Sequence, residues 1–208
     1  MKNKIIIIGA SGHGKVVADI AEKVGYKEIA FLDDNEDTKK CGKYPVIGKS
    51  LDAIKYKDSD FIVGIGNNCV RKQIQEYLLN NGLNVVKLIH PNAVIAPDVS
   101  IGIGTVIVAG AVINSNAKIG QGCIVNTGST IDHDDTIGDF VHISVGCHIA
   151  GTVNIADNCW LCIGSVISNN LSICANCTIG AGAVVVNDIV EQGTYVGVPA
   201  KLIKGNKD

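Results

Sequence analysis

The chain has 208 residues, of which 47% are hydrophobic and 18% charged, and its formal net charge is -2. This composition excludes an intrinsically disordered chain, and the absence of a basic stripe gives no electrostatic case for nucleic acid or an anionic membrane as a partner. Aromatic residues make up only 4%, whereas glycine occurs 24 times. A core of small and β-branched side chains favours thin, repetitive β-structure.

The sequence opens with MKNKIIIIGAS, which combines a basic start with a short apolar run. A secretory signal has a longer apolar segment and a cleavage context, so we interpret the run as a buried first strand. Glycine, asparagine or aspartate interrupts every apolar run before it reaches the roughly 20 residues that a membrane helix needs. We therefore expect a soluble, cytoplasmic protein whose eight cysteines stay reduced.

Short apolar runs alternate with helical patterns over residues 1–90, which predicts a small Rossmann-like domain. Strands are expected at KIIIIG, EIAFLDD, FIVGIG and NVVKLIH, and helices at KVVADIAEKVG and VRKQIQEYLLNNG. Strand, helix and strand in this order are typical of βαβ units and a parallel sheet. His90-Pro91 marks the end of the domain, because proline cannot continue a paired central strand.

Three polar segments follow strands of this domain. GASGHG at 9–14 opens a helix, and its glycines let the backbone approach a phosphate at the helix N-terminus. Asp33 and Asp34 end the second strand, and Gly66 lies in the GIGNN loop after the third. The carboxyl ends of parallel strands form a ligand crevice, so the three segments are expected to converge. The spacing G-x-x-G-x-G differs from the dinucleotide fingerprint, which leaves an NAD-dependent oxidoreductase only as an alternative.

From Ile95 onward an aliphatic residue recurs every six positions, which predicts a β-helix within residues 91–208. Sixteen positions, the anchors, follow this period without a slip: Ile95, Ile101, Ile107, Ile113, Ile119, Val125, Ile131, Ile137, Ile143, Ile149, Ile155, Leu161, Ile167, Ile173, Ile179 and Val185. Four positions after each anchor stands a mostly small residue, the slot residue. No α-helix has this period. The pattern resembles that of the left-handed parallel β-helix, which implies 18 residues per coil and a little over five coils.

Two cysteine pairs, Cys159-x-x-Cys162 and Cys174-x-x-Cys177, match the spacing of a four-thiolate zinc site. The six-residue register argues against such a site. Cys159 and Cys177 occupy slots one coil apart, whereas Cys162 and Cys174 each follow an anchor on a different face. Four thiolates on such different faces cannot form one tetrahedron, so we expect reduced core or surface cysteines and no bound metal.

His133 lies in the most acidic segment of the repeat, at 131–135, where Asp135 occupies a slot that normally holds a small residue. Departures from a local rule are expected at functional sites. An imidazole beside a carboxylate is a natural general base, because the carboxylate fixes the tautomer and stabilises the imidazolium. His133 and Asp134 are therefore the candidate catalytic pair. A solvated acidic turn with a chance histidine is the alternative.

His142 follows His133 by nine residues, half a circuit of an 18-residue coil, so one prism points the two imidazoles in roughly opposite directions. If both serve one site, that site is shared between adjacent subunits, and trimerisation is a condition of activity. His148 occupies the equivalent position on the next face. Three histidines in a β-helix also leave a metalloenzyme resembling the gamma-class carbonic anhydrases as an alternative.

Seven segments together, GASGHG, FLDD, GIGNN, LIHP, 131–135, FVHISVG and VGVPAK, resemble the sialic acid O-acetyltransferase-like family of bacterial sugar acyltransferases. The resemblance spans nearly the whole chain. It implies a homotrimer with active sites between subunits, acetyl-CoA as cosubstrate, and a nucleotide sugar bound by the N-terminal domain. The implied reaction, a step of glycan biosynthesis, acetylates the 4-amino group of a UDP-linked 4-amino-4,6-dideoxy sugar by direct attack.

The resemblance also implies roles for individual residues. The implied nucleotide-sugar contacts are Ser11, Gly12, His13, Asp33, Asp34 and Gly66. His133 would be the general base and Asp134 its partner. The implied acetyl-CoA contacts are His142, Ile163 and Ala181. A sialic acid or other sugar O-acetyltransferase, or an N-acetyltransferase of GDP- or dTDP-linked amino sugars, would show similar motifs, and a scaffold that only binds its ligands is a further alternative.

Overall fold

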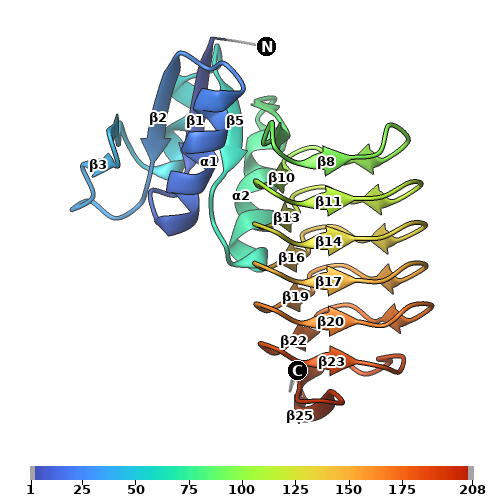
Figure 1. Cartoon of the computed structure of the whole chain (residues 1–208). Coiled ribbons are helices and arrows are strands. Elements are labelled where there is room, and N and C mark those ends of the chain that lie inside the picture. Colours follow the sequence, from blue (N-terminus) through green and yellow to red (C-terminus); the bar gives the residue numbers. More distant parts are fainter. Residues whose placement is uncertain (1–2, 206–208) are drawn as a thin grey trace. The chain divides into compact units, whose positions relative to one another are not determined.

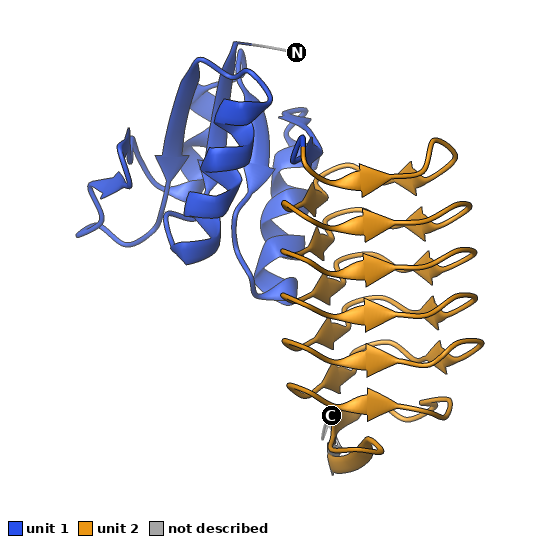
Figure 2. Ribbon diagram, viewed as in Figure 1, with its two compact units in different colours: residues 1–91 blue, residues 92–208 orange. Residues whose placement is uncertain are grey.

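A computed structural model describes residues 3–205 of the chain, with side chains up to residue 203. The chain divides into two compact units, residues 1–91 and 92–208 (Figure 2). None of the helices in the described residues is long and apolar enough to span a bilayer.

The first unit contains a parallel sheet and two helices. Its strands β1 (Lys4–Ile8), β2 (Glu28–Leu32), β5 (Asp60–Val63) and β6 (Asn84–Val85) are ordered β2-β1-β5-β6, and all neighbours are parallel. Helix α1 (Gly12–Lys23) follows β1 and helix α2 (Asn68–Asn80) follows β5 (Figure 1). The four isoleucines of β1 are fully buried, as expected for a central parallel strand. The predicted Rossmann-like βαβ arrangement is confirmed.

A long connection between β2 and β5 has no counterpart in the sequence patterns. It contains the hairpin β3 (Lys40–Cys41) and β4 (Tyr44–Pro45), followed by the short 3-10 helix η1 (Ser50–Lys55). The predicted strand NVVKLIH is divided into β6 and β7 (Leu88–Ile89). Of these two strands only β6 belongs to the parallel sheet of the first unit.

The second unit is a left-handed parallel β-helix. Two-residue strands follow one another every six residues, and the second residue of each is one of the predicted anchors. The strands are β8 (Val94–Ile95), β9 (Ser100–Ile101), β10 (Val106–Ile107), β11 (Val112–Ile113), β12 (Lys118–Ile119), β13 (Ile124–Val125), β14 (Thr130–Ile131), β15 (Thr136–Ile137), β16 (His142–Ile143), β17 (His148–Ile149), β18 (Asn154–Ile155), β19 (Trp160–Leu161), β20 (Val166–Ile167), β21 (Ser172–Ile173), β22 (Thr178–Ile179) and β23 (Val184–Val185).

These strands form the three faces of a prism. The first face holds β8, β11, β14, β17, β20 and β23, the second β9, β12, β15, β18 and β21, and the third β10, β13, β16, β19 and β22. Paired anchors, such as Ile113 and Ile131, are one 18-residue coil apart. Strand β24 (Gly193–Val196) extends the third face and pairs with β25 (Lys201–Gly205), while Ile189 bridges to Ile173 on the second. The solenoid therefore continues past the last predicted anchor.

Anchors and slot residues fill the interior of the prism. The anchors from Ile107 to Val185 are at most 4% exposed. Cys159 and Cys177 are buried in slots of successive coils, as the register predicts. Among the slot residues of the described chain, Asp135 alone carries a carboxyl group, and it too is fully buried. A buried carboxyl group is unusual in so narrow and closely packed an interior.

Candidate active site

His133 lies in the turn between β14 and β15 and is half exposed. Its Nδ1 is 2.8 Å from Oδ2 of Asp134. The other carboxylate oxygen of Asp134 accepts a hydrogen bond of 2.6 Å from the side-chain amide of Asn116, one coil earlier. A carboxylate only accepts, so Nδ1 carries the proton and Nε2 is the basic nitrogen of the ring.

The charges around His133 favour its imidazolium form. The hydrogen bond to Asp134, followed by the charge of Asp132, raises the pKa of His133 above its ordinary value. Hydrogen bonds from Asn116 and His133 lower the pKa of Asp134, so this carboxyl stays ionised near neutral pH. The raised pKa makes the neutral imidazole a stronger base, and the ionised Asp134 stabilises the imidazolium that forms when Nε2 accepts a proton.

The backbone of the turn decides where the Asp134 side chain points. Asp134 has φ of 63°, in the left-handed region, and so do Asn116, Thr152 and Asn170 at the same place in neighbouring coils. Asparagine and aspartate tolerate this region because their short polar side chains bond locally. The repetition of this corner stacks Asn116 against Asp134 and directs the carboxylate toward the imidazole.

The next coil forms a floor under the imidazole. The N–H of Thr152 donates to the carbonyl of His133 at 3.0 Å. A Cβ atom added to Gly151 would lie 2.7 Å from both Cε1 and Nε2 of the ring. The imidazole therefore lies directly against the Gly151 backbone, and a larger residue at this position would displace it.

Asp135 connects the same turn to the next coil from inside the prism. Its Oδ2 accepts the N–H of Asp132 at 3.0 Å, and its Oδ1 accepts the N–H of Val153 at 2.8 Å. Burial raises the pKa of Asp135 to about 7, and the two backbone hydrogen bonds act in the opposite direction. The geometry matches an ionised carboxylate, which accepts with both oxygens.

His142 occupies β16 on the third face and stacks on Trp160 of β19. Their ring centroids are 5.8 Å apart and their planes differ by 9°. The indole N–H of Trp160 donates to Oγ of Ser144 at 3.0 Å, which fixes the ring. The corner between the first and second faces, where His133 lies, is opposite the third face. A single chain therefore does not bring His133 and His142 together.

The other predicted residues of the prism lie on its surface. Ile163 is 59% exposed and Ala181 is also exposed, at the same corner of successive coils. His148, on the first face, has its Nδ1 3.0 Å from Oγ1 of Thr130. Within residues 3–205 no three histidine, cysteine or acidic side chains are grouped in a way that would hold a metal ion.

In the first unit, the segments after β1, β2 and β5 converge. The N–H of Ala10 donates to Oδ2 of Asp33 at 2.6 Å, and the other oxygen of Asp33 accepts the N–H of Asn35 at 2.8 Å. A Cβ on Gly64 would lie 3.0 Å from Cα of Gly14, so the first and third segments touch. Asp34 accepts the N–H of Ser50 at 2.9 Å instead. Asp33 thus orders the loop that carries Ser11, Gly12 and His13.

The sequence patterns missed Arg71, a buried residue that organises the third segment. Its guanidinium donates to the carbonyls of Ile65 and Gly66, each at 3.0 Å, and to Oδ1 of Asn68 at 2.8 Å. Arginine is seldom fully buried without such partners. Arg71 could have been suspected from the sequence, because it lies on the first turns of α2, just after GIGNN.

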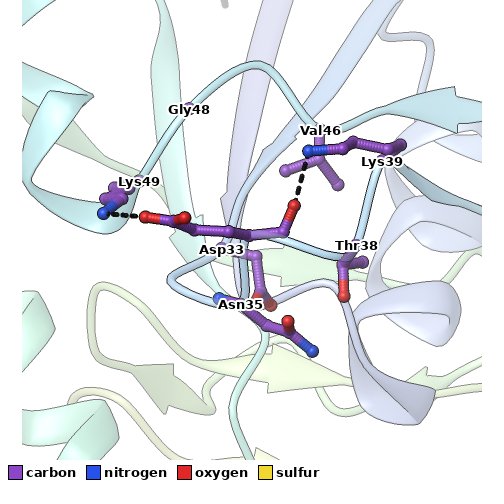
Figure 3. Close-up of a pocket in the computed structure, with 8 residues that line it drawn as sticks. Asp33, Asn35, Thr38, Lys39, Val46, Gly48 and Lys49 are labelled. Carbon is purple, nitrogen blue, oxygen red and sulfur yellow. Dashed lines mark hydrogen bonds and ion pairs between the residues drawn. The ribbon is translucent and has the colours of Figure 1, made fainter.

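A pocket of about 240 Å³ lies beside Asp33 (Figure 3). Its lining residues are Asp33, Asn35, Glu36, Thr38, Lys39, Val46, Gly48 and Lys49. Lys49 forms an ion pair with Glu36 at its edge. Of these residues the sequence patterns singled out Asp33 alone, because the others belong to the connection without a recognisable period.

Comparison with known proteins relates both units to one group of enzymes. A family model described as the PglD N-terminal domain matches residues 4–78. The acetyltransferase domain of PglB from Neisseria gonorrhoeae FA1090, in complex with acetyl coenzyme A, is 39% identical and has a TM-score of 0.93. The alignment covers 98% of this chain and all of that one. The chain belongs to the bacterial sugar acetyltransferase family.

Two further relatives agree with this assignment. PerB from Caulobacter crescentus, in complex with CoA and GDP-perosamine, is 33% identical with a TM-score of 0.91, and the match covers 95% of this acetyltransferase and 96% of PerB. A UDP-N-acetylbacillosamine N-acetyltransferase of Bacillus subtilis (strain 168) is 37% identical over 114 residues. That match spans about half of each sequence, 52% in both cases.

Family membership confirms the enzyme class predicted from the motifs, an acetyl-CoA-dependent sugar acetyltransferase. The relatives that match the chain are acetyltransferases, so the NAD-dependent oxidoreductase left open by the GASGHG spacing is not supported. The carbonic anhydrase-like interpretation of the three histidines is replaced for the same reason.

Proposed function

We propose that this acetyltransferase transfers the acetyl group of acetyl-CoA to the 4-amino group of a UDP-linked 4-amino-4,6-dideoxy sugar. The observation that carries the proposal is the His133–Asp134 hydrogen bond at an exposed corner of a β-helix from this family. The relatives named for UDP-N-acetylbacillosamine and bound to GDP-perosamine favour a nucleotide-linked amino sugar as substrate. The Bacillus relative supports UDP as the nucleotide.

His133 acts as the general base in a direct transfer. Its Nε2 removes the proton of the sugar amine as the amine nitrogen attacks the thioester carbonyl carbon. The tetrahedral oxyanion then collapses, the C–S bond breaks, and the proton held by His133 passes to the CoA sulfur. Asp134 keeps the proton on Nδ1 and stabilises the imidazolium formed on the way. A neutral amine is already a good nucleophile, so none of the cysteines needs to form a covalent intermediate.

The two substrates use different parts of the chain. We place the nucleotide sugar on the first unit, with its diphosphate at the GASGHG segment and the start of α1, where the N-terminal end of the helix dipole favours an anion. Asp33, Asp34 and the pocket beside Asp33 supply acceptors for ribose or sugar hydroxyls. Acetyl-CoA is proposed to lie along the prism against His142, Ile163 and Ala181.

The proposed site requires a second copy of the chain. Reacting groups have to approach within about 3 to 3.5 Å, which one prism does not allow for residues on opposite sides. A homotrimer around a three-fold axis would place the His133 corner of one subunit beside the His142 face of the next and create three equivalent sites.

The test is a thiol-release assay with acetyl-CoA and a panel of UDP-, dTDP- and GDP-linked 4-amino sugars and free sialic acid. We expect the highest kcat/KM with a UDP-linked amino sugar, and a kcat about 10²- to 10⁴-fold lower for His133→Ala. His148→Ala is the matched control, with unchanged kcat. The fluorescence of Trp160, the sole tryptophan, reports acetyl-CoA binding in each variant. Full turnover by His133→Ala, or a preference for sialic acid, would refute the proposal.

A further inference from the structure

The backbone ladder on the first face of the prism is interrupted at one position. In the other coils, the backbone N–H of the residue after the anchor donates to the backbone carbonyl of the anchor in the next coil. These bonds join Ala96 to Ile113, Asn114 to Ile131, Ala150 to Ile167 and Ser168 to Val185, at 2.9–3.0 Å. The N–H of Asp132 instead donates to the side chain of Asp135. The interruption lies immediately before His133.

A slot residue can bond to the next coil without breaking the backbone ladder, as Thr105 shows. Thr105 also occupies a slot, and its Oγ1 accepts the N–H of Cys123, one coil on, at 3.0 Å. Asp135 makes the corresponding bond to Val153. Near Thr105, however, the ladder is intact, because Gly102 donates to the carbonyl of Ile119 at 2.9 Å. The second oxygen of Asp135 is therefore what removes Asp132 from the ladder.

We propose that Asp135 is a positioning residue for His133. Its carboxylate holds Asp132 and Val153 at once and so fixes the turn in the one arrangement that places the imidazole over Gly151. Asp135 lies inside the prism and does not touch substrate, so it acts only through the turn. This inference rests on the proposed role of His133 as general base.

The energetic cost of Asp135 supports a functional reason for it. The slots one coil away hold Ala117 and Val153, which are apolar, and its ionisable neighbours are Asp132 and His133 on the same turn. Burial raises the pKa of Asp135 to about 7. In the unfolded chain an aspartate titrates near pH 4, so the native state loses stability as the pH rises from about 4 through 7. A local rule broken at a cost in stability is expected at functional sites, and the Asp135 slot is such a place.

Asp135→Thr tests the inference, because it converts this slot into the type found at Thr105 and lets Asp132 return to the ladder. We expect kcat to fall on the order of 10- to 100-fold, since small displacements of a catalytic group are costly, with the KM of both substrates nearly unchanged. At pH 8 the thermal midpoint should equal or exceed that of the wild type. Thr105→Ala, the control, should lower the midpoint and leave kcat unchanged.

A readout independent of turnover separates this inference from the proposed function. The His133 ring resonances and their pH titration can be followed by NMR, and loss of the Asp135 charge should lower the pKa of His133. If His133→Ala stays active, the general base assignment fails, yet a displaced His133 resonance in Asp135→Thr still supports the positioning. Unchanged His133 resonances and kcat in Asp135→Thr would overturn the inference. Asp135→Asn is the second variant, and failure of both to fold would also overturn it by showing a structural role.

Discussion

Replacing Gly151 with alanine should displace the imidazole of His133 without disturbing the fold. The added Cβ would lie 2.7 Å from Cε1 and Nε2, whereas ordinary contact begins at 3.4 Å, so the ring has to move by about 0.7 Å. The backbone of Gly151 is outside the left-handed region, so alanine fits it without strain. A misplacement of about 1 Å costs on the order of 10²-fold in rate. We therefore expect kcat to fall about 10- to 100-fold, or ~1.4 to 2.7 kcal/mol in the barrier.

The assay is steady-state thiol release at saturating acetyl-CoA and sugar nucleotide, together with thermal unfolding of each variant. Asn169→Ala provides the control, because Asn169 has the same place in the turn one coil beyond Gly151. It should retain kcat and thermal stability. A Gly151→Ala enzyme with wild-type kcat would refute the reasoning, since it would show either that the ring moves freely or that its position does not matter. A large loss of stability would also contradict it.

Three further predictions concern charge, substrate binding and assembly. Asp134→Asn removes the main cause of the raised pKa of His133, so the acidic limb of the kcat/KM profile should move to lower pH while the plateau falls; an unmoved limb would contradict the pairing. Replacing Asp33 and Asp34 together by alanine should raise the KM of the sugar nucleotide and leave that of acetyl-CoA unchanged, whereas equal changes would indicate general damage to the domain. Mixed trimers of His133→Ala and His142→Ala subunits should regain part of the activity, because some sites then hold both histidines, and no gain despite proven subunit exchange would exclude a shared site.

The period of six made the β-helix predictable to the residue. A narrow interior accepts only aliphatic anchors and small slot residues, so each anchor had to recur at a fixed spacing, and each coincides with the end of a strand. The same rule singled out Asp135, because a carboxyl in a slot breaks the pattern. Gly151 and Trp160 could also have been found, since each stands 18 residues after a candidate histidine.

Other parts of the site depend on contacts that no local pattern records. The Asp132 N–H could donate either to the carbonyl of the anchor in the next coil or to the Asp135 side chain, and the sequence does not show which acceptor it meets. Arg71 and the pocket lining around Lys49 depend on the path of the connection between β2 and β5, whose irregular elements carry no period. The bond from Ala10 to Asp33 likewise joins residues brought together only by the parallel sheet.

The His133 turn has few ways to move. Catalytic residues are disproportionately found on loops, and in many enzymes the opening or closing of a loop limits turnover. Here the turn is four residues long, between strands hydrogen-bonded to coils on both sides. Amides around it are expected to exchange with solvent about as slowly as those of the prism core. Catalysis at this corner would then depend on how the substrates reach a base that does not move. Changes in substrate preference would have to come from substitutions within coils of constant length, and not from insertions.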